Sequence, residues 1–164
     1  ARRPQDLTGP VRLKNVISDA LDLMQPRLRN VEVCYTCPEQ EVWARGGPVR
    51  LQQVLVNLLG NALDAMQGRV PQRIEIALTD GDAPEISVRD FGPGLSRAAL
   101  DQAFDPFFTT KEPGQGLGLG LSISYNIVRD FGGHLAASNH PEGGAVFRIV
   151  LEATEPDSAE VAAQ

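Results

Sequence analysis

The chain has 164 residues with 15 basic and 21 acidic side chains, and its formal net charge is −6. An acidic protein with a pI near 4.9 lacks the broad positive field that binding to nucleic-acid phosphates needs, so we expect neither DNA nor RNA as a partner. No apolar run approaches the roughly 18 residues of a membrane span, and the first ten residues lack the apolar core of a secretory signal. The sequence is therefore typical of one soluble domain of intracellular style.

The first half of the chain predicts a helix, two strands and a second, longer helix. Apolar residues at 13, 16, 17, 20, 21 and 24 have helical spacing, which predicts a helix over residues 11–28 that Pro26 breaks near its end. Two short strands follow over 31–36 and 41–44, joined around Pro38. The sequence Gly46-Gly47-Pro48 then opens a helix that reaches about residue 66.

Cys34 and Cys37 are the only cysteines, and they lie within and just after the first predicted strand. There is no second pair of ligands for zinc, and no helix follows directly as in a thioredoxin-like site. We therefore interpret both cysteines as structural residues.

The second half predicts a hairpin, two helices and two final strands. Alternating apolar residues predict antiparallel strands over 73–79 and 85–90. A short helix over 96–104, a loop over 105–117 and a helix over 118–131, stopped by Gly132-Gly133, precede strands over 134–138 and 145–152. This order predicts an α+β two-layer sandwich in which a mixed, mostly antiparallel sheet is covered on one face by helices.

We expect all parts to form one domain. Residues 1–44 contribute its first helix and strands, residues 45–152 its functional core, and residues 153–164 a flexible tail.

The run GQGLGLG over residues 114–120 places Gly116, Gly118 and Gly120 at alternate positions where a loop becomes a helix. Glycine lets the backbone approach an anion closely, and the first turn of a helix offers unpaired N–H groups and a positive dipole end. The run favours a phosphate site, although alternating glycines are equally typical of an ordinary tight connection.

The long helix carries a polar stripe beside an apolar one. The apolar stripe consists of Leu51, Leu55, Leu58 and Ala62 and should face the core. The polar stripe, at spacings of four, four and three, consists of Gln53, Asn57, Asn61 and Asp64. A solvated polar face is one interpretation. The other is a set of amide oxygens that help to hold Mg²⁺, which takes few protein ligands and keeps phosphates and waters for the rest.

Asp90 ends a predicted strand and shares its parity with Ile86 and Val88, so its carboxylate should point to the buried face. The turn that includes Gly92 and Gly94 leaves space beside this carboxylate for a flat heterocycle with an exocyclic amine, such as adenine. The alternative is that Asp90 caps the turn.

Three of the six phenylalanines, Phe104, Phe107 and Phe108, lie within five residues of a loop. Exposed aromatic area is costly unless it packs against something or clamps a mobile segment, and at least one of the three should anchor the loop to the core. The three residues that follow, Thr109, Thr110 and Lys111, could meet phosphate or a partner surface.

Taken in order, four segments resemble the N, G1, F and G2 boxes of the sensor histidine kinase catalytic domain: QQVLVNLLGNALDAM, RDFGPGL, AFDPFFTTK and GQGLGLGLSISYNIVRDFGG. The resemblance covers about residues 45–150. The wording of the boxes is most similar to nitrogen-regulation and C4-dicarboxylate sensor kinases. The wider superfamily includes gyrase B-type and mismatch-repair ATPases, and the resemblance implies their Bergerat-type sandwich, with ATP held between helices and a lid.

The resemblance also implies roles by position. Asn61 would coordinate Mg²⁺ with Asn57 assisting, which makes these two asparagines the catalytic candidates, and Asp64 and Gln53 would lie near the phosphates. Asp90 would accept the adenine amine, with Gly92 and Gly94 shaping the pocket. The lid and its support would comprise the remaining ATP-binding candidates: Phe104, Thr109, Thr110, Lys111, Gly116, Leu117, Gly118, Leu119 and Gly120.

The reaction type follows from one position. ATPases of this superfamily have a water-activating glutamate where this chain has Asn57, and an amide cannot act as a base. The resemblance therefore implies transfer of the γ-phosphoryl group to a histidine on a separate dimerisation domain, whose His-Glu signature this chain lacks. His134 and His140 are expected to be structural.

We expect a monomeric, cytoplasmic fragment of a homodimeric sensor that acts indirectly on a response regulator. Whether that parent is membrane-anchored stays open. Three alternatives also stay open: a gyrase-type ATPase switch, a non-catalytic nucleotide-binding or docking module, and a protein serine kinase of the same fold.

Overall fold

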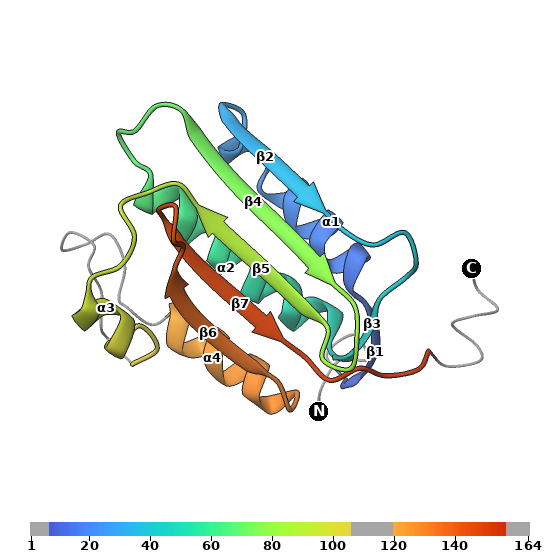
Figure 1. Ribbon diagram of the computed structural model, residues 1–164. Coiled ribbons are helices and arrows are strands. Elements are labelled where there is room, and N and C mark those ends of the chain that lie inside the picture. Colours follow the sequence, from blue (N-terminus) through green and yellow to red (C-terminus); the bar gives the residue numbers. More distant parts are fainter. Residues whose placement is uncertain (1–6, 106–119, 157–164) are drawn as a thin grey trace.

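The computed structural model describes residues 7–105 and 120–156 (Figure 1). Along the chain its elements are β1 Gly9–Arg12, α1 Leu13–Leu23, the 3₁₀ turn η2 Gln25–Arg27, β2 Val31–Thr36, β3 Trp43–Gly46, α2 Pro48–Ala65, β4 Gln72–Thr79, β5 Glu85–Asp90, α3 Arg97–Gln102, α4 Gly120–Asp130, β6 His134–Asn139 and β7 Ala145–Val150. No helix among these residues is long and apolar enough to cross a membrane.

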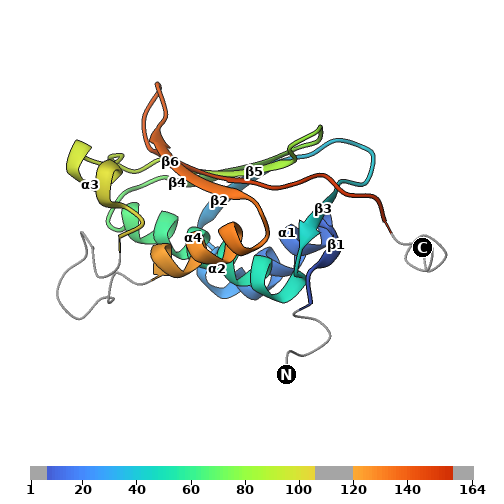
Figure 2. The same cartoon turned by 90° about the horizontal axis from the view of Figure 1, so that it is seen from below.

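The main sheet of the described residues has five strands in the order β2-β4-β5-β7-β6. β2 pairs in parallel with β4, and the other neighbours pair antiparallel, with Val88 of β5 opposite Ile76 of β4 on one side and Phe147 of β7 on the other. Helices α1, α2 and α4 lie side by side on one face of this sheet, and its other face is open (Figure 2). The predicted α+β two-layer fold is confirmed.

The core lies between this sheet and the helices, because the strands and the helices each place their apolar side chains on one face. Alternate residues of β4 and β5, such as Ile76 and Val88, point to the helices and are buried. The predicted apolar stripe of α2 is buried as well, and burying each of its leucines stabilises the fold by about 1.5–3 kcal/mol.

The predicted helix over 11–28 is wrong at both ends. Residues 9–12 are extended because β1 pairs antiparallel with β3, with Val11 opposite Ala44, in a separate two-stranded sheet. At the other end α1 stops at Leu23, and Pro26 lies in η2. Helical spacing identified side chains that pack on the core, five of them buried and Leu21 half-buried, but it carries no information about a strand pairing more than 30 residues away.

The strands predicted over 31–36 and 41–44 do not belong to one sheet. β2 joins the main sheet beside β4, whereas β3 begins at Trp43 and pairs with β1.

Several other boundaries shift by a few residues. α2 ends at Ala65, the helix predicted over 96–104 covers only Arg97–Gln102, β6 extends to Asn139, and β7 stops at Val150. The predicted stop of the last helix is confirmed, because Gly132 has a φ of +80° and the N–H of Gly133 donates to the carbonyl of Val128, a common helix-ending motif.

Candidate functional site

The polar stripe of α2 lies on the part of the helix surface that is not buried in the core. Asn57 and Asn61 are half-buried, whereas Gln53 and Asp64 are exposed. Asn57 reaches the neighbouring helix α4, where its Nδ2 donates a hydrogen bond of 3.1 Å to Oγ of Ser124. Asn57 is therefore partly committed to a contact between two helices, which the sequence did not indicate.

The exposed end of the stripe meets a cation from η2. Nη2 of Arg27 lies 3.4 Å from Oδ1 of Asp64, and both side chains are about half exposed. A surface ion pair of this kind adds little to stability. It does place a guanidinium beside the last turn of α2, which no sequence pattern predicted.

Asp90 is only 3% exposed, so the burial expected from its parity in β5 is confirmed. Its Oδ1 accepts hydrogen bonds from the backbone N–H of Gly92 at 2.8 Å and of Ala145 at 3.4 Å. Within residues 7–105 and 120–156, no donor lies against Oδ2. The capping interpretation thus holds for one oxygen of the carboxylate and leaves the other for a ligand.

Burial raises the pKa of the Asp90 carboxyl above its ordinary value. The backbone hydrogen bonds from Gly92 and Ala145, and then the charges of Arg69 and Arg89, lower the pKa and offset only part of this effect.

The loop after β5 is held against the end of α2. A Cβ on Gly92 would lie 2.8 Å from the carbonyl oxygen of Ala65, so only glycine allows this approach. Asn139 at the end of β6 fixes the other side of the loop, because it accepts from the N–H of Leu95 at 2.7 Å and donates to its carbonyl at 2.8 Å. Asp90 and the stripe of α2 are thereby brought to one place.

Gly144, the residue directly before β7, packs against the backbone of Asp90. Its φ is +83°, and a Cβ there would overlap the backbone carbonyl of Asp90. Neither Gly144 nor Asn139 was predicted as a site residue from the sequence. The Gly143-Gly144 pair was a visible signal of an unusual backbone, whereas a single asparagine at a strand end carried none.

The start of α4 completes the site. A Cβ on Gly120 would lie 2.5 Å from Oδ1 of Asn57, so α4 begins directly against the stripe of α2. The other proposed lid residues lie outside the described residues, and their roles stay predictions: Phe107, Phe108, Thr109, Thr110, Lys111, Gly116, Leu117, Gly118 and Leu119.

Phe104 anchors the segment that follows α3. Its ring stacks on Tyr125 of α4 with centroids 5.2 Å apart and meets Phe147 of β7 edge-on at 6.5 Å. This is the anchoring that the sequence predicted for at least one phenylalanine, and such pairs favour a fixed ring position.

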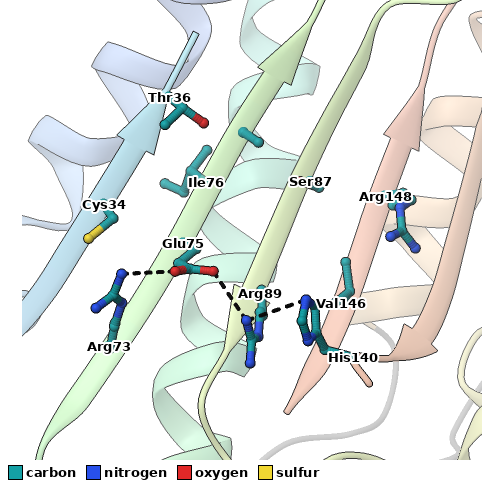
Figure 3. A pocket seen from close by; sticks show the side chains of 11 residues that line it. Cys34, Thr36, Arg73, Glu75, Ile76, Ser87, Arg89, His140, Val146 and Arg148 are labelled. Atoms are coloured by element: carbon teal, nitrogen blue, oxygen red, sulfur yellow. Dashed lines mark hydrogen bonds and ion pairs between the residues drawn. The ribbon is translucent and has the colours of Figure 1, made fainter. Parts of the chain in front are cut away.

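A separate hollow of about 410 Å³ lies on the open face of the sheet (Figure 3). There Glu75 bridges Arg73 at 2.9 Å and Arg89 at 3.3 Å, and Arg89 also lies 3.4 Å from Nε2 of His140. Because successive residues of a strand point to opposite faces, Arg89 faces this hollow while Asp90 faces the helices. The hollow is therefore not part of the site around Asp90.

Comparisons with known proteins identify the family and the fold. Residues 46–155 match the family described as histidine kinase-, DNA gyrase B- and HSP90-like ATPases. The chain is 46% identical over 145 residues to the C4-dicarboxylate transport sensor protein DctB of Pseudomonas aeruginosa, an alignment that covers 86% of this chain and 24% of that protein.

Two solved kinases have the same fold. The catalytic domain of histidine kinase ThkA superposes with a TM-score of 0.80 at 29% identity, covering 91% of this chain and 99% of that one. ThkA has also been solved in complex with the response regulator protein TrrA, with a TM-score of 0.76 at 29% identity over 90% of this chain and 42% of that one. Full-length ShkA in complex with AMPPNP has a TM-score of 0.76 at 26% identity, covering 92% of this chain and 32% of that one.

The chain belongs to the family of histidine kinase-, DNA gyrase B- and HSP90-like ATPases. Within it, the chain is the ATP-binding catalytic domain of a two-component sensor histidine kinase, as the motifs indicated. It spans 24% of the length of DctB and therefore corresponds to a part of such a protein.

Proposed function

We propose that this domain holds Mg-ATP with its adenine on Asp90 and presents the γ-phosphate to a histidine of another domain. The observation that carries the proposal is the buried Asp90, whose Oδ1 is held by two backbone donors while Oδ2 has no donor among the described residues. An ionised carboxylate only accepts hydrogen bonds, so Oδ2 suits the exocyclic amine of adenine.

The phosphates would extend from this point along α2. Gly92 packs on Ala65, and Asn57 lies eight residues earlier, about 12 Å along the helix at about 1.5 Å per residue. That span suits a triphosphate whose base lies at Asp90. Asn61, half-buried between the two ends, offers an amide oxygen in this region.

The residues present fit a magnesium ion in this place. Mg²⁺ needs only one or two protein oxygens, and Asn61 would supply one of them. When bound, the ion would neutralise charge on the phosphates. The side chains of the domain then orient the nucleotide, and in-line attack is left to an imidazole from elsewhere.

The partners follow from the same assignment. The phosphate acceptor would be a histidine on a dimerisation domain of the parent kinase, and a response regulator would receive the phosphoryl group afterwards, in keeping with the ThkA–TrrA complex. The parent would be a homodimer, and this part of it would lie in the cytoplasm, where ATP is available.

Radiolabelled ATP tests the transfer. The domain is mixed with a separately produced dimerisation domain of the same parent, and acid-labile label is located by mass spectrometry. We expect label on the histidine of the added domain and none on this chain. Stable label on His134 or His140 would overturn the proposal.

A further inference from the structure

Ser124 lies on the side of α4 that faces α2 and is 2% exposed. Its Oγ accepts the hydrogen bond of 3.1 Å from Nδ2 of Asn57, which joins residues 67 positions apart in the sequence. A buried hydroxyl without a partner is costly, so this contact satisfies Ser124 and at the same time fixes the amide of Asn57.

With Nδ2 held in this way, the Asn57 amide has one orientation. Its Oδ1 then points at the first residue of α4, where a Cβ on Gly120 would lie only 2.5 Å away. The amide cannot rotate away from an added Cβ without giving up the bond to Ser124. The fixed orientation of the Asn57 side chain therefore requires both glycine at position 120 and serine at position 124.

We propose that Ser124 is a positioning residue for the nucleotide site, which acts by fixing the Asn57 amide between α2 and the start of α4. The inference rests on the proposed function. It changes the role of Asn57 from an assisting magnesium ligand to a link that sets α4 relative to the phosphate end of α2. Asn57 lies far from the adenine position, so the link bears on the phosphates and not on the base.

The first measurement is the Kd of AMPPNP with Mg²⁺, and of adenosine, for the wild-type domain and Ser124→Ala. Loss of one hydrogen bond should weaken AMPPNP binding by about 3- to 10-fold and leave adenosine within about twofold. Ser138→Ala is the matched control, because Ser138 also accepts one side-chain hydrogen bond, from Arg148 at 3.0 Å. That bond lies at the open face of the sheet, so AMPPNP binding should not change.

The second measurement tests whether Ser124 and Gly120 both act through Asn57. We expect Ser124→Ala to cause no further loss of AMPPNP affinity in an Asn57→Ala background. Gly120→Ala should weaken AMPPNP binding in the wild type and have less than about a twofold effect once Asn57 is shortened, because the clash is then gone. Near-UV circular dichroism verifies that each variant is folded. If Ser124→Ala does not fold, the comparison of Gly120→Ala in the wild-type and Asn57→Ala backgrounds tests the proposal instead.

The outcomes separate the two proposals. Unchanged AMPPNP binding in Ser124→Ala, equal losses for AMPPNP and adenosine, or losses that multiply with Asn57→Ala would each overturn the positioning role while leaving ATP binding intact. A folded wild-type domain that binds no AMPPNP would overturn the proposed function, and the positioning role with it.

Discussion

Asp90 uses its two carboxylate oxygens differently, and an amide substitution separates them. In Asp90→Asn the oxygen can still accept from Gly92 and Ala145, but an amino group replaces Oδ2 and would face the adenine amine. We expect ATP affinity to fall about 10- to 100-fold, measured by isothermal titration calorimetry. A variant that binds ATP as well as the wild type would contradict the adenine assignment.

The raised pKa of Asp90 gives a pH dependence with a definite sign. Below its raised pKa the carboxyl is protonated, and a donor then faces the adenine amine, so ATP affinity should fall as the pH decreases through that raised pKa. Asp90→Asn should show no such component. The check is the Kd of ATP for both proteins from neutral to acidic pH, and parallel curves would count against Asp90 as the titrating group.

Stability of the free domain responds to pH in the opposite direction. A carboxyl with a raised pKa binds its proton more tightly in the folded state, so its contribution is favourable below the unfolded pKa of about 3.9 and is lost as the pH rises through the folded value. At neutral pH the charged, buried Asp90 therefore costs stability. We expect Asp90→Asn to keep or raise the Tm at pH 7, so that its binding loss cannot be attributed to unfolding.

Some of these site residues are predictable from the sequence and others are not, for a physical reason. The burial of Asp90 follows from strand parity alone, and the stripe of α2 follows from helical spacing. The contacts of Asn139 with Leu95 and of Asn57 with Ser124 join residues 44 and 67 positions apart, and no local pattern encodes them. They depend on which elements become neighbours.

At the scale of elements, the contacts of Asn139 should hold the loop after β5 in the conformation that binds ATP. Asn139→Ala removes both partners of the Leu95 backbone, which should lower the free energy of unfolding by about 1–3 kcal/mol and weaken ATP binding several-fold. Urea denaturation and calorimetry measure the two effects. Asn15→Ala, at an exposed position of α1, is the control and should change neither. If Asn139→Ala lost stability but bound ATP normally, this loop would not shape the site.

The spacing of apolar residues is sufficient to predict the long elements but not the short ones. α2, β4 and β5 have long, regular patterns, and their predicted bounds are correct to within one residue. β1 is four residues long, and its last two residues, Val11 and Arg12, were predicted as the start of a helix because the pairing of β1 with β3 is set by tertiary contacts. A short edge strand can be predicted only when the strand that pairs with it is known.

At the scale of the whole molecule, the domain should bind ATP without consuming it. The stripe of α2 presents an amide at Asn57, which cannot activate water, and that amide is held by Ser124. We expect phosphate release from ATP at the background rate, in a steady-state assay that uses Asp90→Asn to measure contaminating activity. Rapid turnover by the wild type alone would favour an ATPase switch.

The central claim is that a buried carboxylate selects adenine, and competition between ATP and GTP tests it most directly. Guanine presents a carbonyl oxygen where adenine presents its amine, so it would set an acceptor against Oδ2 of Asp90. With a fluorescent ATP analogue and Mg²⁺, we expect ATP to displace the probe at least about tenfold more effectively than GTP, and Asp90→Asn to lose this preference. Equal displacement by ATP and GTP from the wild-type domain would contradict the account.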